Sequence, residues 1–89
     1  MEHFLKTDPI PFDDVVSGNK RFEIRADDRD FNVGDILTLR RTAHTGEEMR
    51  NGAPLVYSGG VISVRVTHIM RGPIYGLKNG WVIMSIGPC

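Results

Sequence analysis

Glycine and proline interrupt this chain so often that it can form only short elements of secondary structure. Ten glycines and five prolines are spread along its 89 residues, and both residue types tend to end helices and strands. The length supports one hydrophobic core but not two, so we predict a single domain over residues 1–89. No apolar stretch approaches the roughly 20 residues of a transmembrane helix, and Met1–Thr7 lacks the apolar centre of a secretion signal.

Cysteine content and charge exclude several classes of protein. The single cysteine is Cys89, so we expect no disulfide framework, no cysteine-based zinc site and a reducing, cytoplasmic compartment. The 11 basic and 11 acidic residues cancel, which argues against a general polyanion binder. Residues 1–35 carry an acidic excess and residues 36–89 a basic one. Either the surface is dipolar or the two halves interleave in one fold.

The first part of the chain predicts one strand and one short helix. His3–Lys6 alternates between apolar and polar residues, as a strand does. Thr7 or Asp8 can cap a helix of about two turns, and Gly18 can end it. The apolar face of this helix consists of Phe12, Val15 and Val16.

From residue 20 the period changes to two. Phe22 and Ile24 fall on one face of a strand over residues 20–25, and the other face carries Arg21, Glu23 and Arg25. Later strands are predicted at Ile36–Arg41, Val61–Met70 and Trp81–Ile86. Between the first two lies a long hairpin excursion, Thr42–Gly60. One early helix followed by four or five strands predicts a small α+β domain with a curled, barrel-like sheet.

Three charged residues cluster where the predicted helix meets the strand. Lys20 stands at the junction, and Glu23 and Arg25 lie about 7 Å apart on one side of the strand. A cation–anion–cation cluster of this kind suits a planar polar ligand or a shared proton. The alternative is an exposed ion pair on a solvated sheet face, and periodicity alone favours that alternative.

The string Gly18-x-Lys20-x-x-Glu23-x-Arg25 resembles the signature of the ASCH group of PUA-like domains. The resemblance is to a subgroup of small single-domain proteins that phages and prophages often encode, and only the excursion at residues 42–60 diverges. Its segments are His3–Thr7, Phe22–Arg25, Asp28–Phe31, Val33–Asp35, Val64–Ile69 and Gly76-Leu77.

The resemblance implies a PUA-like (ASCH) β-barrel of about five strands with one short N-terminal helix. It also implies a module that binds RNA or a nucleotide and recognises a base or nucleoside. Glu23 would accept a hydrogen bond from the base, Arg25 would orient Glu23 or bind a carbonyl or phosphate, and Lys20 would contact phosphate or carbonyl oxygen. Lys6 and Arg29 would stand at the edge of this cleft.

A second reading is a small hydrolase. Some ASCH proteins remove the acetyl group from N4-acetylcytidine, and another branch contains a ribonuclease. In such an enzyme Glu23 would act as base and Lys20 would stabilise the oxyanion. The chain departs from the amidohydrolase pattern, because Glu23 stands where that pattern has a threonine. The strand Val61–Met70, where a glutamate is expected, has none.

A third reading is a phage-type interaction protein that docks on a host or phage protein, as a monomer or weak dimer. No motif calls for a cofactor. The acidic residues Asp27, Asp28, Asp30 and Asp35 favour turns and pairing with Arg29 over a metal site.

Two further side chains carry specific expectations. Tyr75, in the loop before the last strand, is the preferred candidate for stacking on a base, whereas Trp81 is expected in the core. His68 is expected on the apolar face of its strand with Val64 and Val66, as a core or interface histidine.

Overall fold

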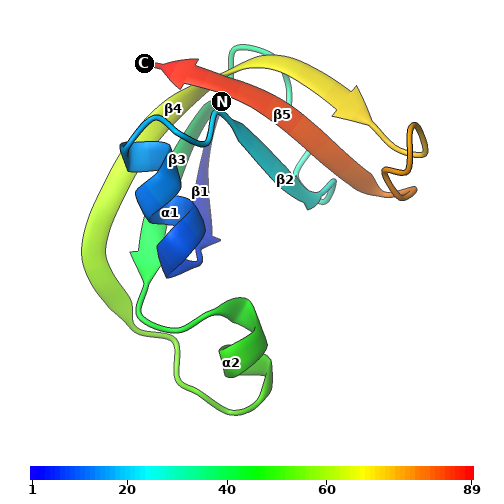
Figure 1. Cartoon of the computed structure of the whole chain (residues 1–89). Helices are drawn as coiled ribbons and strands as arrows, with labels where there is room; N and C mark the ends of the chain where they lie inside the picture. The colour runs from blue at the N-terminus through cyan, green and yellow to red at the C-terminus, as the bar shows by residue number, and fades with distance from the viewer.

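Five strands form one strongly curled sheet in the computed structural model, which describes all of residues 1–89 (Figure 1). The elements are β1 (Glu2–Thr7), α1 (Pro9–Val16), β2 (Phe22–Ala26), β3 (Ile36–Thr42), α2 (Gly46–Arg50), β4 (Tyr57–Arg71) and β5 (Trp81–Pro88). The strand order is β1-β3-β4-β5-β2. β1 is parallel to β3, and all other neighbours are antiparallel. The predicted small α+β domain with a curled sheet is confirmed.

The sheet mixes the two halves of the chain. β1 and β2 come from the acidic first part, and they pair with β3 and β5 from the basic second part. The opposite charges therefore interleave in one fold, which was one of the two predicted outcomes. Neither helix has the length and hydropathy of a membrane-spanning segment.

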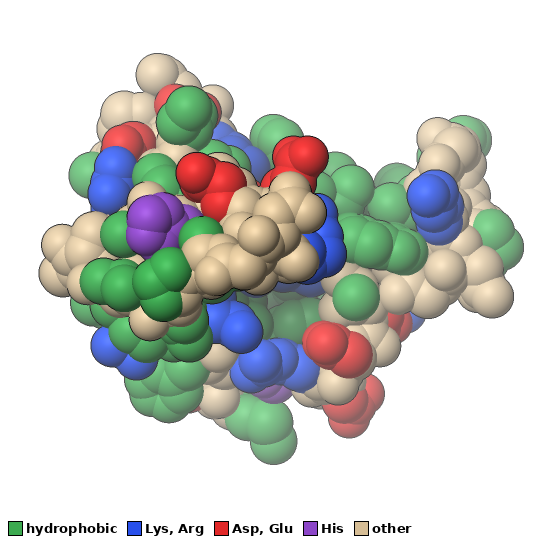
Figure 2. Space-filling view, turned by 90° about the horizontal axis from the view of Figure 1, so that it is seen from below, with side chains coloured by type: hydrophobic (Ala, Val, Ile, Leu, Met, Phe, Trp, Pro, Cys, Tyr) green, Lys and Arg blue, Asp and Glu red, His purple; other side chains and the backbone are tan.

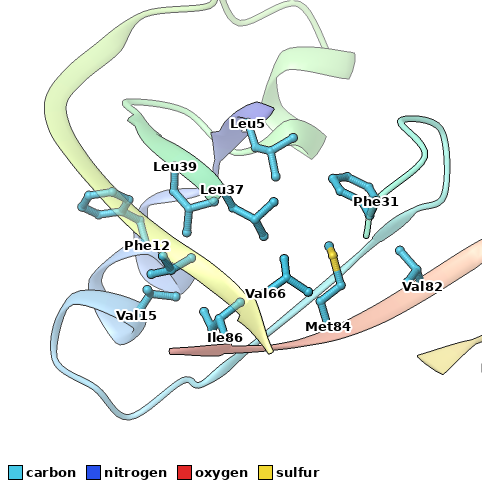
Figure 3. Close-up of a cluster of buried hydrophobic side chains, with 11 residues drawn as sticks. Leu5, Phe12, Val15, Phe31, Leu37, Leu39, Val66, Val82, Met84 and Ile86 are labelled. Carbon is cyan, nitrogen blue, oxygen red and sulfur yellow. The ribbon is translucent and has the colours of Figure 1, made fainter. Parts of the chain in front are cut away.

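The core lies between α1 and the inner face of the sheet, where side chains from most elements converge (Figure 3). Its members are Leu5, Phe12, Val15, Phe31, Leu37, Leu39, Val64, Val66, Val82, Met84 and Ile86. α1 packs closely on β4, because a Cβ atom added to Gly60 would lie only 2.9 Å from Cε1 of Phe12. Val16, predicted for the same helix face, is exposed, since the short helix buries only Phe12 and Val15.

The alternation predicted for β2 is correct, and the charged face is the one that points inward. Glu23 is 2% exposed, whereas Phe22 and Ile24 are 43% and 47% exposed. The register with β5 explains this orientation, because Glu23 lies opposite the fully buried Met84. Residues directly opposite each other share a face of the sheet. The reading of an exposed ion pair is therefore wrong.

The long strand β4 contains an irregularity that moves His68. The register with β5 shifts between Val66 and His68, which leaves Thr67 without a partner. One extra residue turns every later side chain to the other face. His68 is exposed as a result, and its predicted place beside Val64 and Val66 is wrong. The buried histidine is His3.

The excursion at residues 42–60 contains a helix that periodicity does not predict. α2 begins after Thr45, whose side chain accepts a hydrogen bond from the Glu48 amide while the Glu48 carboxylate accepts one from the Thr45 amide. This reciprocal capping box satisfies two amides that a helix start leaves free. β4 then begins at Tyr57, four residues earlier than predicted.

Candidate functional site

The two edge strands of the sheet, β1 and β2, are joined by arginine side chains. Arg25 donates from Nη1 to the Lys6 carbonyl at 2.9 Å and from Nη2 to Thr7 Oγ1 at 3.1 Å. Arg29 donates to the Phe4 carbonyl at 3.1 Å. The carbonyl groups of an outer strand edge need partners. Here two guanidinium groups donate hydrogen bonds to these carbonyl groups. The curled sheet is open between β1 and β2, and we call this opening the seam.

Glu23 lies at this seam between two cations. Its Oε1 accepts hydrogen bonds from Arg25 Nη2 at 2.8 Å and Nε at 3.0 Å. Its Oε2 accepts one from Lys20 Nζ, which also donates to the Phe22 carbonyl at 2.7 Å. The side chains of Glu23, Lys20 and Arg25 are 3%, 16% and 23% exposed. The carboxylate is thus buried and paired, while both cations keep contact with water.

A cleft of about 400 Å³ opens over this cluster. Figure 2 looks at the molecule from the side of α2, and Lys and Arg side chains border a hollow in the middle of that face. The lining residues are Lys6, Thr7, Asp8, Pro11, Lys20, Glu23, Ile24, Arg25, Ala26, Gly46, Arg50 and Trp81. The structure therefore brings four of the predicted site residues together: Lys6, Lys20, Glu23 and Arg25.

The other two predicted site residues lie elsewhere. Tyr75 is 90% exposed in the loop before β5 and does not line the cleft. Arg29 holds the seam through Phe4 but does not line the cleft either. The aromatic residue of the cleft is Trp81, which is 41% exposed, so its predicted place in the core is wrong. Trp81 begins β5 and pairs with Ala26 at the end of β2, beside Arg25.

Sequence reasoning missed two charged residues of the cleft. Asp8 precedes α1 but makes no side-chain cap for it; its Oδ1 accepts a hydrogen bond from the Gly46 amide at 3.0 Å instead. Arg50 ends α2 and reaches the cleft from the divergent excursion. The available signal was the spacing of Thr45 and Glu48, which is that of a capping box and so marks the start of a helix.

A larger hollow, of about 620 Å³, lies on the other side of Lys20. Its lining is largely apolar or glycine, and its only charged residues are Lys20 and Arg21. It contains neither Glu23 nor Arg25, and no Asp or Glu side chain lines it. A polar ligand would find few hydrogen-bond acceptors there, so the cleft over Glu23 is the better candidate site.

A second buried carboxylate, Asp35, lies at the other end of β1. Its Oδ2 accepts hydrogen bonds from His3 Nε2 at 2.8 Å and from the Asn32 amide at 3.0 Å. The hydrogen bond from His3 is the main cause that lowers the pKa of Asp35 below its ordinary value of 3.8. His3 also meets Phe31 edge to face, with ring centroids 4.8 Å apart.

The acidic residues that follow β2 do not form a cluster. Asp27 pairs with Arg71 at 3.0 Å, and Asp28 lies 3.9 Å from Arg29, the pairing that was expected. No three His, Cys, Asp or Glu side chains converge in a way that could hold a metal ion.

Comparison with known proteins places the chain in a family. The family described as a domain of unknown function, DUF3850, matches residues 2–86. A search of curated proteins finds no match. Because the family match spans nearly the whole chain, this protein belongs to the DUF3850 family.

Proposed function

We propose that the cleft over Glu23 binds one base of RNA or of a free nucleotide, and that the curled sheet is of the PUA-like (ASCH) type. The observation that carries this proposal is a buried carboxylate held between two partly exposed cations inside a cleft. Buried charges without a structural need are uncommon, because desolvation opposes them. Such groups in a cleft are therefore candidates for ligand recognition.

The three side chains keep hydrogen-bonding capacity for a ligand. An ammonium has three donors and a guanidinium has five; Lys20 uses two of its three, and Arg25 four of its five. An ionised carboxylate offers about four acceptor positions, of which Glu23 uses three. One acceptor flanked by two donors matches a planar group that presents a donor between two acceptors. The edge of a pyrimidine imide is a group of this kind.

Charge and shape also support a small ligand or a short single strand. The chain is neutral overall, whereas binding to long duplexes relies on a basic surface. Trp81 can offer a stacking face at the cleft, as aromatic residues do for unpaired bases.

Hydrolysis is the second candidate, because Lys20 and Glu23 are in direct contact. Both Glu23 oxygens already accept hydrogen bonds from cations. A general base needs a lone pair directed at the proton that it removes. One acceptor position of Glu23 remains and can take a proton, but Lys20 and Arg25 have no acceptor to which it could pass that proton. Binding is therefore the better supported function.

A chemical-shift titration tests the proposal. The labelled protein is mixed with nucleosides, N4-acetylcytidine included, with nucleotides and with short RNAs, and the same samples are assayed for product. We expect shifts at Lys20, Glu23, Arg25 and their neighbours, without product. Product formation would identify a hydrolase. Unchanged spectra across the panel would overturn the proposal and direct the search to a protein partner.

A further inference from the structure

A second hollow adjoins the cleft on the side of α2. It measures about 390 Å³ and is lined by Lys6, Asp8, Gly46, Met49 and Arg50. All of these except Met49 also line the cleft over Glu23. The two hollows therefore share part of their walls, and a ligand in the cleft can extend toward Lys6 and Arg50.

The charges of this outer hollow are not balanced within the chain. Lys6 and Arg50 are exposed and form no ion pair, unlike Lys20 and Arg25, which share Glu23. The only acidic residue of the lining is Asp8, and one of its oxygens accepts the hydrogen bond from Gly46. Two cations thus border a hollow that holds one carboxylate, an arrangement that attracts an anion.

The position of Arg50 is set by contacts at the start of the excursion. Thr42 Oγ1 lies 3.2 Å from the Thr7 carbonyl and 2.7 Å from the His44 carbonyl. Asp8 then holds Gly46, the first residue of α2. The end of β3 and the first residue of α2 are therefore each attached to the β1–α1 junction, and Arg50 at the other end of α2 reaches the lining of the cleft.

We infer that Lys6 and Arg50 bind a phosphate group of the nucleotide whose base occupies the cleft. This inference rests on the proposed function and specifies its ligand as a phosphorylated one. A guanidinium donates two parallel hydrogen bonds to phosphate oxygens, and an ammonium adds a point charge. Lys20 and Arg25 have one free hydrogen-bond donor each, and their charges are paired with Glu23. Lys6 and Arg50 are therefore the better partners for a phosphate.

Paired ligands separate this subsite from the cleft itself. The affinities of uridine and uridine monophosphate are measured by chemical-shift titration, and a dinucleoside monophosphate replaces the terminal phosphate by a diester. We expect the monophosphate to bind about tenfold tighter than the nucleoside, as charge-assisted hydrogen bonds would give. Whether the diester gains as much decides between a free nucleotide and an RNA strand as the natural source.

The matched variants are Lys6→Gln with Arg50→Gln, and Lys78→Gln as control. All three residues are exposed, and Lys78 lines neither hollow. We expect the double variant to bind uridine and its monophosphate with equal affinity, and the control to keep the preference for the monophosphate. Equal binding of nucleoside and monophosphate by the parent protein overturns the subsite and leaves the proposed function standing. If neither ligand binds, and the wider panel is silent as well, the proposed function fails and the subsite with it.

Discussion

Glu23 and Asp35 are two carboxylates buried to a similar depth, 2% and 5% exposed, with different kinds of partner. Asp35 is held by the His3 ring, the Asn32 amide and the N-terminal ammonium of Met1, and His3 is itself 5% exposed. Glu23 is held by Lys20 and Arg25, which reach the wall of a cleft.

The difference shows what makes a buried charge available to a ligand. The hydrogen bonds of Asp35 all join β1 and the N-terminus to the turn before β3, and its closest partner is the buried His3 ring, so Asp35 serves the fold and lines no cleft. The partners of Glu23 are two long cationic side chains whose charged ends remain in contact with water. Glu23 can therefore orient those cations toward a ligand, and it keeps one acceptor position of its own.

The largest effect is expected from Glu23→Gln. Removing one partner from a fully buried ion pair costs roughly 3–5 kcal/mol. We expect about 2–3 kcal/mol here, because Lys20 and Arg25 are partly hydrated. Nucleotide binding should fall by about tenfold or more, since Glu23 both orients the cations and accepts from the base. Urea unfolding and the chemical-shift titration measure the two effects.

The control for this variant is Glu47→Gln, the same change at an exposed residue of α2 that lines neither hollow. It should leave stability and binding unchanged. If Glu23→Gln lowers stability but binds nucleotide like the parent, Glu23 contributes only to the fold, as Asp35 does. The proposed difference in function between the two carboxylates would then be wrong.

Asp35→Asn should lower stability by about 1–3 kcal/mol without weakening binding. An amide oxygen in the place of Oδ2 can still accept from His3 and Asn32, but it carries no charge. The NH2 group in the place of Oδ1 cannot accept from the Met1 ammonium, so one hydrogen bond is lost. Asp28→Asn, at a residue whose side chain is 69% exposed, is the matched control. A loss of nucleotide affinity in folded Asp35→Asn protein would mean that the two ends of β1 are coupled.

Trp81→Leu should weaken binding about fivefold or more, from the lower end of the roughly 1–3 kcal/mol that one stacked base contributes. Tyr75→Leu should have no effect, because Tyr75 does not line the cleft. The unfolding midpoint should change little in either variant, since both rings are exposed. Equal affinity of Trp81→Leu and parent protein would remove stacking from the proposed recognition, and the polar cluster alone would carry it.

Much of the fold could be predicted because local patterns determine it. Period-two alternation and the glycine and proline breaks located all five strands, and spaced apolar residues before Gly18 located α1. The side-chain cap predicted for α1 at Thr7 or Asp8 is wrong, because the Asp8 carboxylate accepts from Gly46 instead. Alternation alone does not predict which face of a strand points toward the core. β2 carries Phe22 and Ile24 on one face, yet its pairing with β5 turns Glu23 toward the core. A single unpaired residue, Thr67, likewise moved His68 to the surface.

The site was predictable where its residues are close in sequence and not where they are distant. Lys20, Glu23 and Arg25 fall within one junction and one short strand, so their meeting follows from local geometry. Thr7 and Arg50 reach the same cleft through the β1–β2 seam and the docking of α2. Those contacts join segments far apart in the chain, and periodicity does not describe them.

The smallest expected effect is the pH dependence of the stabilisation that Asp35 provides. Its pKa is lowered in the folded protein, mainly by the hydrogen bond from His3. The unfolded chain therefore binds the proton first as the pH falls, and the stabilisation is complete above the unfolded value and lost through the lower folded value. The stability difference between parent and Asp35→Asn should be constant from about pH 7 to 5 and narrow below the ordinary value of 3.8.

Urea unfolding at a series of pH values measures this difference. Asp13, whose pKa is lowered by the hydrogen bond from Arg41, is present in both proteins, so its own contribution cancels. Asp28→Asn, measured over the same pH series, is the control for removing a carboxylate at an exposed position. A difference that stays constant down to about pH 3 would mean that Asp35 acts by shape rather than by charge. Asp35 and Glu23 would then differ only in the residues that surround them.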